Sequence, residues 1–291
     1  MKLSKSFIGL VTVSTIFMLY ASGLYTNLQS DSALEIVDFS IAKPASEKNI
    51  PSNPDRVPLY GDLHVHTKYS FDAYIFGVTA TPYDAYKYAI GEAIKHPLGF
   101  DMKLKEPLDF YAVTDHGFYM GMIENYADTS SKMSKNEWTM PMHNLNRPEN
   151  VTVESLGARA DLFSSVLTQA IIKPYPYWHP KVWKAWLTNN IQVALQSFDY
   201  DVHKSAWADV ANAAEEFNDP GKFTTFIGYE FTTSTDVEGG NLHRNVIFNS
   251  SDAPIRPWTR IDSINPEDLW TWMDGLRDQG LDSLAMPHNS N

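Results

Sequence analysis

The sequence predicts an α/β fold of the β/α-barrel kind, in which short apolar strands alternate with helices or long loops. Three observations support this prediction. Apolar segments of strand length recur along the chain, helix-start signals lie between them, and polar side chains that can bind a metal stand close to the ends of successive strands. In a β/α barrel the functional residues collect at the carboxyl ends of the strands.

The first predicted strand, residues 59–66, contains the pattern HVH. Successive side chains along a strand point to opposite faces, so Asp62, His64 and His66 share one face, each about 7 Å from the next. One histidine would be ordinary in a strand. Two in register, followed by Asp72, are typical of the start of a metal site.

The remaining elements follow in the order expected of an α/β protein. Thr81 and Asn265 each precede a proline and can cap a helix, so helices are predicted over residues 81–94 and 265–280. Further strands are predicted at residues 108–113, 223–231, 241–248 and 281–286. Close to the ends of these strands lie His116, Glu230, His243 and His288.

Three other segments surround or interrupt this core. Residues 1–25 place Lys2 and Lys5 before an apolar stretch and small residues, the layout of a secretory signal peptide or, alternatively, an uncleaved membrane anchor. The protein is therefore expected to be exported, as a periplasmic or secreted protein. Residues 26–58 are polar and proline-rich and predict a linker before a main domain over 59–291. Residues 118–200 predict a mostly helical insertion.

Charge and cysteine content limit the function. The formal net charge of −12 argues against nucleic acid or an anionic membrane surface as a partner, because both require a basic face. The chain has no cysteine, so a bound metal must take histidine and carboxylate ligands. Such ligands suit zinc, manganese or iron.

Five segments occur in a characteristic order: GDLHVHTKYSFDA, FYAVTDHG, FIGYEFT, GNLHRNVIF and MPHN. Together they resemble the DUF3604 branch of the PHP (polymerase and histidinol phosphatase) superfamily of metal-dependent phosphoesterases. The resemblance implies a distorted β/α barrel with two or three divalent metal ions at the carboxyl ends of its strands. It also implies a set of ligands: His64, His66, Glu230 as a bridge between two ions, His243 and His288, with His116 and Asp72 near a third position.

Other residues are expected to assist these ligands. Asp62 and Asp115 are predicted to orient imidazoles, because a ligating histidine usually donates its other N–H to an acceptor. Arg244, next to His243, is either a clamp for an anionic group or an ordinary surface arginine. The expected activity is hydrolysis of a phosphoester or similar small anionic ester by a metal-activated water, with Glu230, Asp115 and Arg244 as the catalytic residues.

Two other classes share part of this pattern. An amidohydrolase also begins with HxH on its first strand, but that class expects a lysine on a middle strand. A metal-binding barrel without catalytic activity would keep the same ligands. PHP-type sites usually finish with Asp-x-His, which does not follow His288. The chain is therefore expected to be a fragment, incomplete at its C-terminus and inactive or unstable in isolation.

Overall fold

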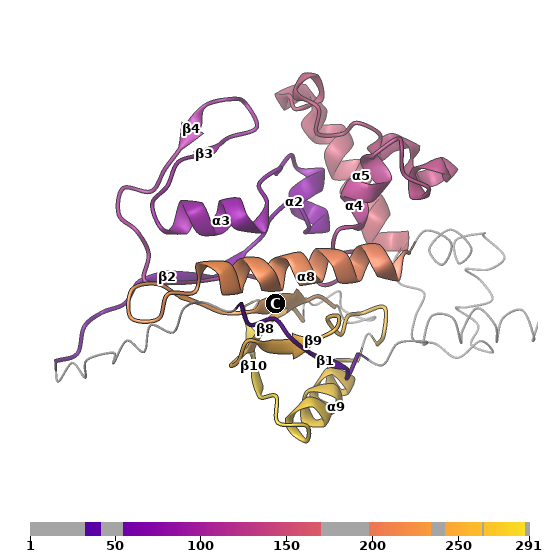
Figure 1. Cartoon of the computed structure of the whole chain (residues 1–291). Coiled ribbons are helices and arrows are strands. Elements are labelled where there is room, and N and C mark those ends of the chain that lie inside the picture. The colour runs from indigo at the N-terminus through magenta and orange to yellow at the C-terminus, as the bar shows by residue number, and fades with distance from the viewer. Residues whose placement is uncertain (1–32, 42–54, 170–197, 234–241, 264, 289–291) are drawn as a thin grey trace, which may run out of the picture.

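Two three-stranded sheets form the centre of the structure, a computed structural model that describes residues 33–41, 55–169, 198–233, 242–263 and 265–288. The first sheet is parallel, in the order β2 (Gly61–Val65), β5 (Phe110–Val113), β6 (Thr224–Thr225). The second is antiparallel, in the order β10 (Ser283–Pro287), β8 (Arg244–Phe248), β7 (Gly228–Phe231). This mixed arrangement confirms the α/β class (Figure 1).

The two sheets meet where β5 continues past its last strand residue. His116 forms a parallel bridge with Glu230, and the Glu230 N–H donates to the Asp115 carbonyl at 3.0 Å. Strands β7 and β10 therefore run in the same direction as β2 and β5, whereas β8 runs in the opposite direction. The carboxyl ends of four strands and the beginning of β8 consequently lie at one edge.

Aromatic residues join two helices to the face of β7 and β8 that lies opposite Glu230. Trp207 of α8 (Tyr200–Phe217) and Trp272 of α9 (Pro266–Arg277) both pack edge-on against Tyr229, with ring centroids 5.8 and 6.4 Å away. Neighbouring residues on a strand face opposite ways, so this apolar contact directs Glu230 to the other side of β7. Figure 1 shows α8 running across the strands.

Helix α3 (Pro82–Ala89) begins as predicted and ends early. Thr81 and Asp84 form a capping box, and Pro82 occupies the first turn. The helix was predicted to continue to residue 94, but Gly91 adopts φ +82° and stops it. Residues Ile94–Lys95 instead form β3, which pairs with β4 (Asp101–Met102).

The described part of the predicted insertion is largely helical. It contains α4 (Met122–Ala127), α5 (Leu156–Gln169) and the short 3-10 helices η1 (Met133–Lys135), η2 (Glu137–Met142), η3 (Pro148–Asn150) and η4 (Val153–Ser155). Helices α4, α5, η1 and η2 share a second apolar core with α2 (Phe71–Ile75), in which Phe71 and Tyr126 are buried. Residues 170–197 of the insertion lie outside the described residues.

The segment predicted as a linker contributes a strand. Within residues 26–58, β1 (Ile36–Asp38) pairs with β9 (Asp252–Pro254), a strand that the sequence did not predict. Ala33, which precedes β1, is also buried, and its carbonyl accepts the Trp272 indole N–H at 2.8 Å. This part of residues 26–58 is therefore packed onto the main domain.

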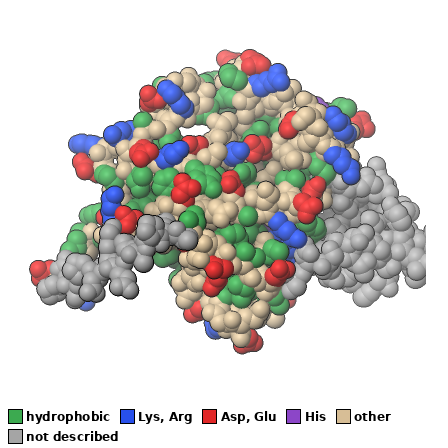
Figure 2. Space-filling view, viewed as in Figure 1, with side chains coloured by type: hydrophobic (Ala, Val, Ile, Leu, Met, Phe, Trp, Pro, Cys, Tyr) green, Lys and Arg blue, Asp and Glu red, His purple; other side chains and the backbone are tan. Residues whose placement is uncertain are grey.

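The surface is mixed in charge. Figure 2 shows acidic and basic side chains interspersed with hydrophobic ones over the face in view. The predicted signal peptide or anchor, residues 1–25, lies outside the described residues. Within the described ranges, none of the helices combines the length and apolar character needed to cross a membrane.

Candidate metal centre

Glu230 lies at the centre of a group of histidines and is only 1% exposed. Its Oε2 atom is 2.9 Å from His66 Nε2, 3.3 Å from His64 Nε2 and 3.4 Å from His116 Nδ1. His64 and His66 come from β2, and His116 follows β5. One carboxylate oxygen thus faces three imidazoles from two neighbouring strands.

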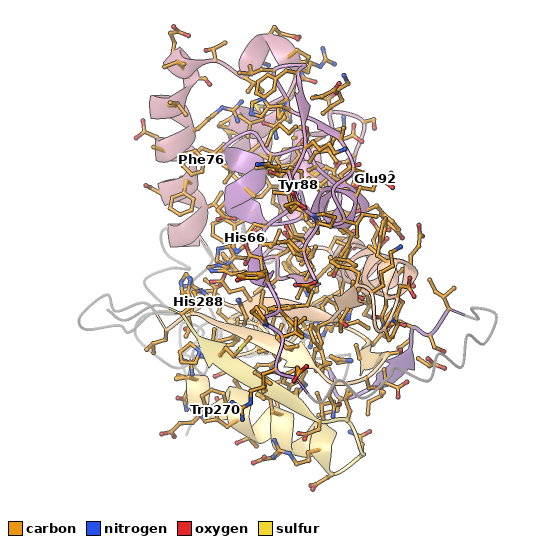
Figure 3. The ribbon with its side chains drawn as sticks, turned by 90° about the vertical axis from the view of Figure 1, so that its left-hand side faces the viewer. His66, Phe76, Tyr88, Glu92, Trp270 and His288 are labelled. Carbon is orange, nitrogen blue, oxygen red and sulfur yellow. The ribbon has the colours of Figure 1, made fainter. Side chains whose placement is uncertain are left out.

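The other oxygen of Glu230 faces a different pair of histidines. Its Oε1 atom is 2.6 Å from His243 Nδ1, just before β8, and 3.2 Å from His288 Nε2, just after β10. The His288 ring centroid is 4.0 Å from that of His64, so the two ends of the strand order meet here. Figure 3 shows His66 and His288 near each other at this edge.

A second carboxylate completes the cluster on the side of α2. Asp72 Oδ1 is 3.3 Å from His66 Nδ1, and its Oδ2 is 3.5 Å from His116 Nε2. The Ser70 hydroxyl donates to Asp72 at 2.5 Å and also accepts the His116 backbone N–H at 3.2 Å. This serine therefore links the turn after β2 to the end of β5.

These side chains form three overlapping groups that could hold a metal ion. The groups are His64, His66 and Glu230; His66, Asp72 and His116; and His116, Glu230 and His243. Within each group the ligand atoms all lie within 4.8 Å of one another. His288 contacts Glu230 directly, so the structure brings all seven predicted ligands together.

Several nitrogen and oxygen atoms of the cluster are buried without hydrogen-bond partners among the described residues, which suits metal ligands. His66 Nε2 and Glu230 Oε2 are buried and lie 2.9 Å apart, yet neither has a hydrogen-bond partner in the described structure. His288 Nδ1 is also buried without a partner there. Buried polar atoms are normally satisfied, so these orphaned atoms are consistent with ligands whose common partner is a metal ion.

The local charges keep the carboxylates ionised. Burial alone would raise the pKa of Glu230, but the close approach of the surrounding imidazoles, His243 above all, holds it well below its usual range. Burial would also raise the pKa of Asp72, which His116 and His66 lower strongly. The reverse applies to His66: burial opposes its protonation, but Asp72 and Glu230 raise its pKa to about 10. An ionised carboxylate is the form that binds a metal.

Two acids predicted to orient imidazoles have other partners. The buried Asp115 carboxylate accepts the Thr67 backbone N–H, and also the Thr67 hydroxyl at 2.6 Å. Burial raises the pKa of Asp115 to about 6. Asp62 accepts the backbone N–H of His64 at 2.9 Å. Both acids therefore fix the backbone beside His64 and His66. Asp62 does so locally, two residues before His64, whereas Asp115 does so from the end of the neighbouring strand β5.

The predicted anion clamp, Arg244, points away from the cluster. Its guanidinium lies 4.9 Å from the Trp270 ring of α9 and donates to the Leu242 carbonyl at 3.2 and 3.3 Å. Adjacent strand residues face opposite sides, so a position next to His243 places Arg244 on the helix side. Of the two predicted roles, these contacts favour an ordinary surface arginine over a clamp for an anionic group.

Some residues at the site were missed in the sequence. Thr232 contacts His116 Nδ1 through its hydroxyl, and Asn245 donates to the Leu63 carbonyl at 2.7 Å, which ties β8 to β2. Thr232 lies two positions after Glu230, a spacing that predicts the same face of a strand. Asn245 lies opposite Glu230 in the β7–β8 pair, which only the strand register reveals.

The fold and the site define a mixed α/β protein with a buried histidine and carboxylate cluster that could hold metal ions. The chain belongs to the DUF3604 family, described as a protein of unknown function, whose family profile matches residues 53–291. Searches of curated proteins and of solved structures found no match.

Proposed function

We propose that this protein is a metal-dependent hydrolase that cleaves a phosphoester or a similar small anionic ester. The observation that carries the proposal is the division of the histidines between the two oxygens of Glu230. Three imidazoles face Oε2 and two face Oε1. A carboxylate whose two oxygens face separate sets of imidazoles suits two neighbouring cations, one at each oxygen. An ion pair with a purely structural role does not require this division.

The three overlapping groups would each offer ligands to one ion. His64, His66 and Glu230 would hold one cation, and His116, Glu230 and His243 a second. His66, Asp72 and His116 offer a third position. Zinc, manganese and iron suit these ligands. When bound, such ions lower the pKa of water and neutralise charge on a phosphoryl group.

The protein's own residues hold this centre in place. The Ser70 hydroxyl donates to Asp72 and fixes its carboxylate. Asp115 accepts from Thr67, the residue directly after His66, and so fixes the turn that follows β2. The Glu230 backbone is held on both sides, by His116 just after β5 and by Asn245 of β8. Fixed ligands of this kind keep the reacting groups in place without reorganisation during the reaction.

The strand arrangement supports a PHP-type barrel as the frame for this activity. Asn245 of β8 reaches across to Leu63 of β2, and His288 reaches His64 from the far end of the strand order. Both contacts require a strongly curved sheet. Lys2, Lys5 and the following apolar stretch further support the proposal that the protein acts outside the cytoplasm.

Replacement of Glu230 by glutamine tests the proposal. The variant keeps the shape of the side chain but removes the charge shared by five imidazoles. We expect bound metal to fall, and hydrolysis of p-nitrophenyl phosphate or bis(p-nitrophenyl) phosphate to drop more than about a hundredfold. Metal content is measured by mass spectrometry after dialysis, and hydrolysis by release of p-nitrophenol.

Glu267→Gln provides the matched control, because Glu267 lies on the exposed first turn of α9. This variant is expected to retain the metal and the activity of the natural protein. The proposal fails if the natural protein binds no metal, or if Glu230→Gln hydrolyses both substrates at the unaltered rate.

A further inference from the structure

A polar pocket of about 830 Å³ lies beside the metal centre and is separate from it. The segment from His66 to Asp72 divides the two. His66 and Asp72 face the metal centre, whereas Lys68 and Tyr69 line the pocket. The volume falls within the range of pockets that bind small molecules.

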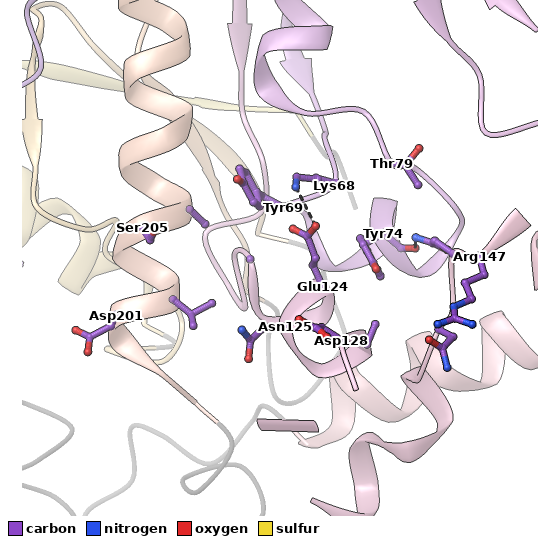
Figure 4. Close-up of a pocket in the computed structure, with 16 residues that line it drawn as sticks. Lys68, Tyr69, Tyr74, Thr79, Glu124, Asn125, Asp128, Arg147, Asp201 and Ser205 are labelled. Carbon is purple, nitrogen blue, oxygen red and sulfur yellow. Dashed lines mark hydrogen bonds and ion pairs between the residues drawn. The ribbon is translucent and has the colours of Figure 1, made fainter. Parts of the chain in front are cut away.

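The pocket walls come from several elements. Figure 4 shows Asp201 and Ser205 of α8 on one side and Arg147 on the opposite side, with Lys68 and Glu124 between them. The Lys68 ammonium and the Glu124 carboxylate form an ion pair at 2.9 Å, which leaves hydrogen-bonding capacity on both groups.

One wall atom lacks the partner that a buried group requires. Asn125 Oδ1 is buried and accepts no hydrogen bond in the described part of the chain. Asn125 lies on α4, and its side chain lines the pocket. A buried acceptor without a donor is unfavourable, and a ligand hydroxyl that reached this oxygen would supply the missing donor.

The charges of the lining select among ligand classes. The acids Glu124, Asp128 and Asp201 outnumber the bases Lys68 and Arg147. The acidic excess would repel an anionic ligand, and the two bases would repel a simple cation. A neutral ligand with many hydroxyl groups can donate to the acids and accept from the bases.

Ring faces add to this complementarity. Tyr69 and Tyr74 both line the pocket. A tyrosine ring offers an apolar surface beside a polar tip. The C–H face of a sugar ring can pack on the apolar ring surface of a tyrosine, and the sugar hydroxyls can form hydrogen bonds with the tyrosine hydroxyl.

We propose that this pocket binds a neutral polyhydroxylated ligand, namely a small carbohydrate. The carbohydrate site is independent of the metal centre, because none of the lining residues belongs to the metal-binding groups. The inference therefore extends beyond hydrolysis and does not depend on it.

Calorimetric titration of the full chain in the presence of EDTA tests this site without the metal centre. The probes are maltose, cellobiose and sucrose, and we expect at least one to bind with a Kd of about 1 mM or tighter. Ser205→Trp fills the pocket from α8 and should weaken that binding at least about tenfold. Thr79→Trp, which fills it from the other side, gives a second measurement if the first variant does not fold.

The control is Ser164→Trp, an exposed serine of α5 that does not line the pocket, and its affinity should equal that of the natural protein. Inorganic phosphate and glycylglycine represent anionic and zwitterionic ligands. The proposal is overturned if no sugar binds, if the folded pocket variants bind sugar normally, or if a charged probe alone binds in a manner that Ser205→Trp abolishes.

Discussion

Side-chain direction decides which polar residues of this protein meet. His64 and His66 share one face of β2 because they are two positions apart, and both reach Glu230. Arg244 adjoins His243 in sequence but faces Trp270, because adjacent strand residues point apart. The shared face of His64 and His66 could be predicted from their spacing, whereas the wider ligand set rested on the family resemblance. The clamp role of Arg244 rested on sequence proximity alone, and its contact with Trp270 favours the alternative, a surface strand arginine.

The buried histidine of α8 provides a second residue-scale feature. His203 is 1% exposed and lies beside the backbone of Met120. Burial, reinforced by the positive charge of Arg256, lowers its pKa to about 3. The folded protein therefore keeps His203 neutral at a pH where the unfolded chain is protonated.

His203 is expected to destabilise the protein in mild acid. The unfolded histidine takes up a proton below about pH 6.5 and the folded one does not, so stability is complete above that pH and falls below it. The loss between pH 6.5 and 5 is about 2 kcal/mol. Urea unfolding at the two pH values should show that difference reduced by a similar amount in His203→Gln. An unchanged pH dependence would contradict this account.

At the scale of elements, one glycine sets the approach of α4 to α8. Gly121 precedes α4 with φ +74°, and a Cβ placed on it would lie only 2.6 Å from the Cβ of Ala206 in α8. Gly99 has a similar φ of +92°, but a Cβ there would meet nothing within 4 Å. The two positions separate backbone strain from a packing clash.

Gly121→Ala should therefore cost more stability than Gly99→Ala. We expect about 1 kcal/mol for Gly99→Ala, from the left-handed backbone alone. Gly121→Ala adds displacement of α8 and should cost about 3 kcal/mol or more. Urea unfolding measures both values. Equal losses would show that the two helices do not need their close approach.

Arg159 connects α5 to the rest of the insertion. It is 2% exposed. Its guanidinium donates to five acceptors: the carbonyls of Ile75, Leu145 and Asn150, Oδ1 of Asn146 and Oγ of Ser155. The acceptors come from three separate segments, so this side chain holds them together.

Arg159→Met is expected to destabilise the insertion by about 3 kcal/mol, because buried carbonyls lose their donors. Arg277→Met is the control, since Arg277 makes only exposed ion pairs with Asp274 and Asp282 and should change stability little. Thermal unfolding of both variants, followed by circular dichroism, makes the comparison. A loss of stability in the Arg277 variant as large as that in the Arg159 variant would contradict it.

Local signals predicted elements more accurately than distant pairings did. Thr81 and Asn265 cap helices as the sequence indicates, because a cap depends on neighbouring residues. The pairing of β1 with β9 joins residues 36–38 to 252–254, and nothing in either segment alone specifies it. Asn245 and its bond to Leu63 were missed for the same reason.

At the scale of the whole molecule, the candidate metal-binding groups connect strands of both sheets. Ligand atoms from β2, the ends of β5 and β10, and the start of β8 all converge on Glu230 of β7. Anything that binds only the folded arrangement stabilises it by mass action. Bound cations should therefore stabilise the whole domain.

Addition of manganese or zinc is expected to raise the Tm by about 5–10 °C at an ion concentration about a hundred times the Kd, and EDTA should reverse the shift. His288→Ala should reduce the shift. His96→Ala should leave it intact, because His96 stacks on Phe100 outside the cluster. A shift that survives in Glu230→Gln would show that the ions bind elsewhere.

The contact between His64 and His288 also affects the order of assembly. These residues lie near opposite ends of the matched region, yet their rings are 4.0 Å apart. A chain that has formed only its first sheet offers the imidazoles of β2 and His116, without the carboxylate of Glu230. The complete set of candidate ligands exists only after β10 has docked, so full occupancy by metal ions would report that folding has finished.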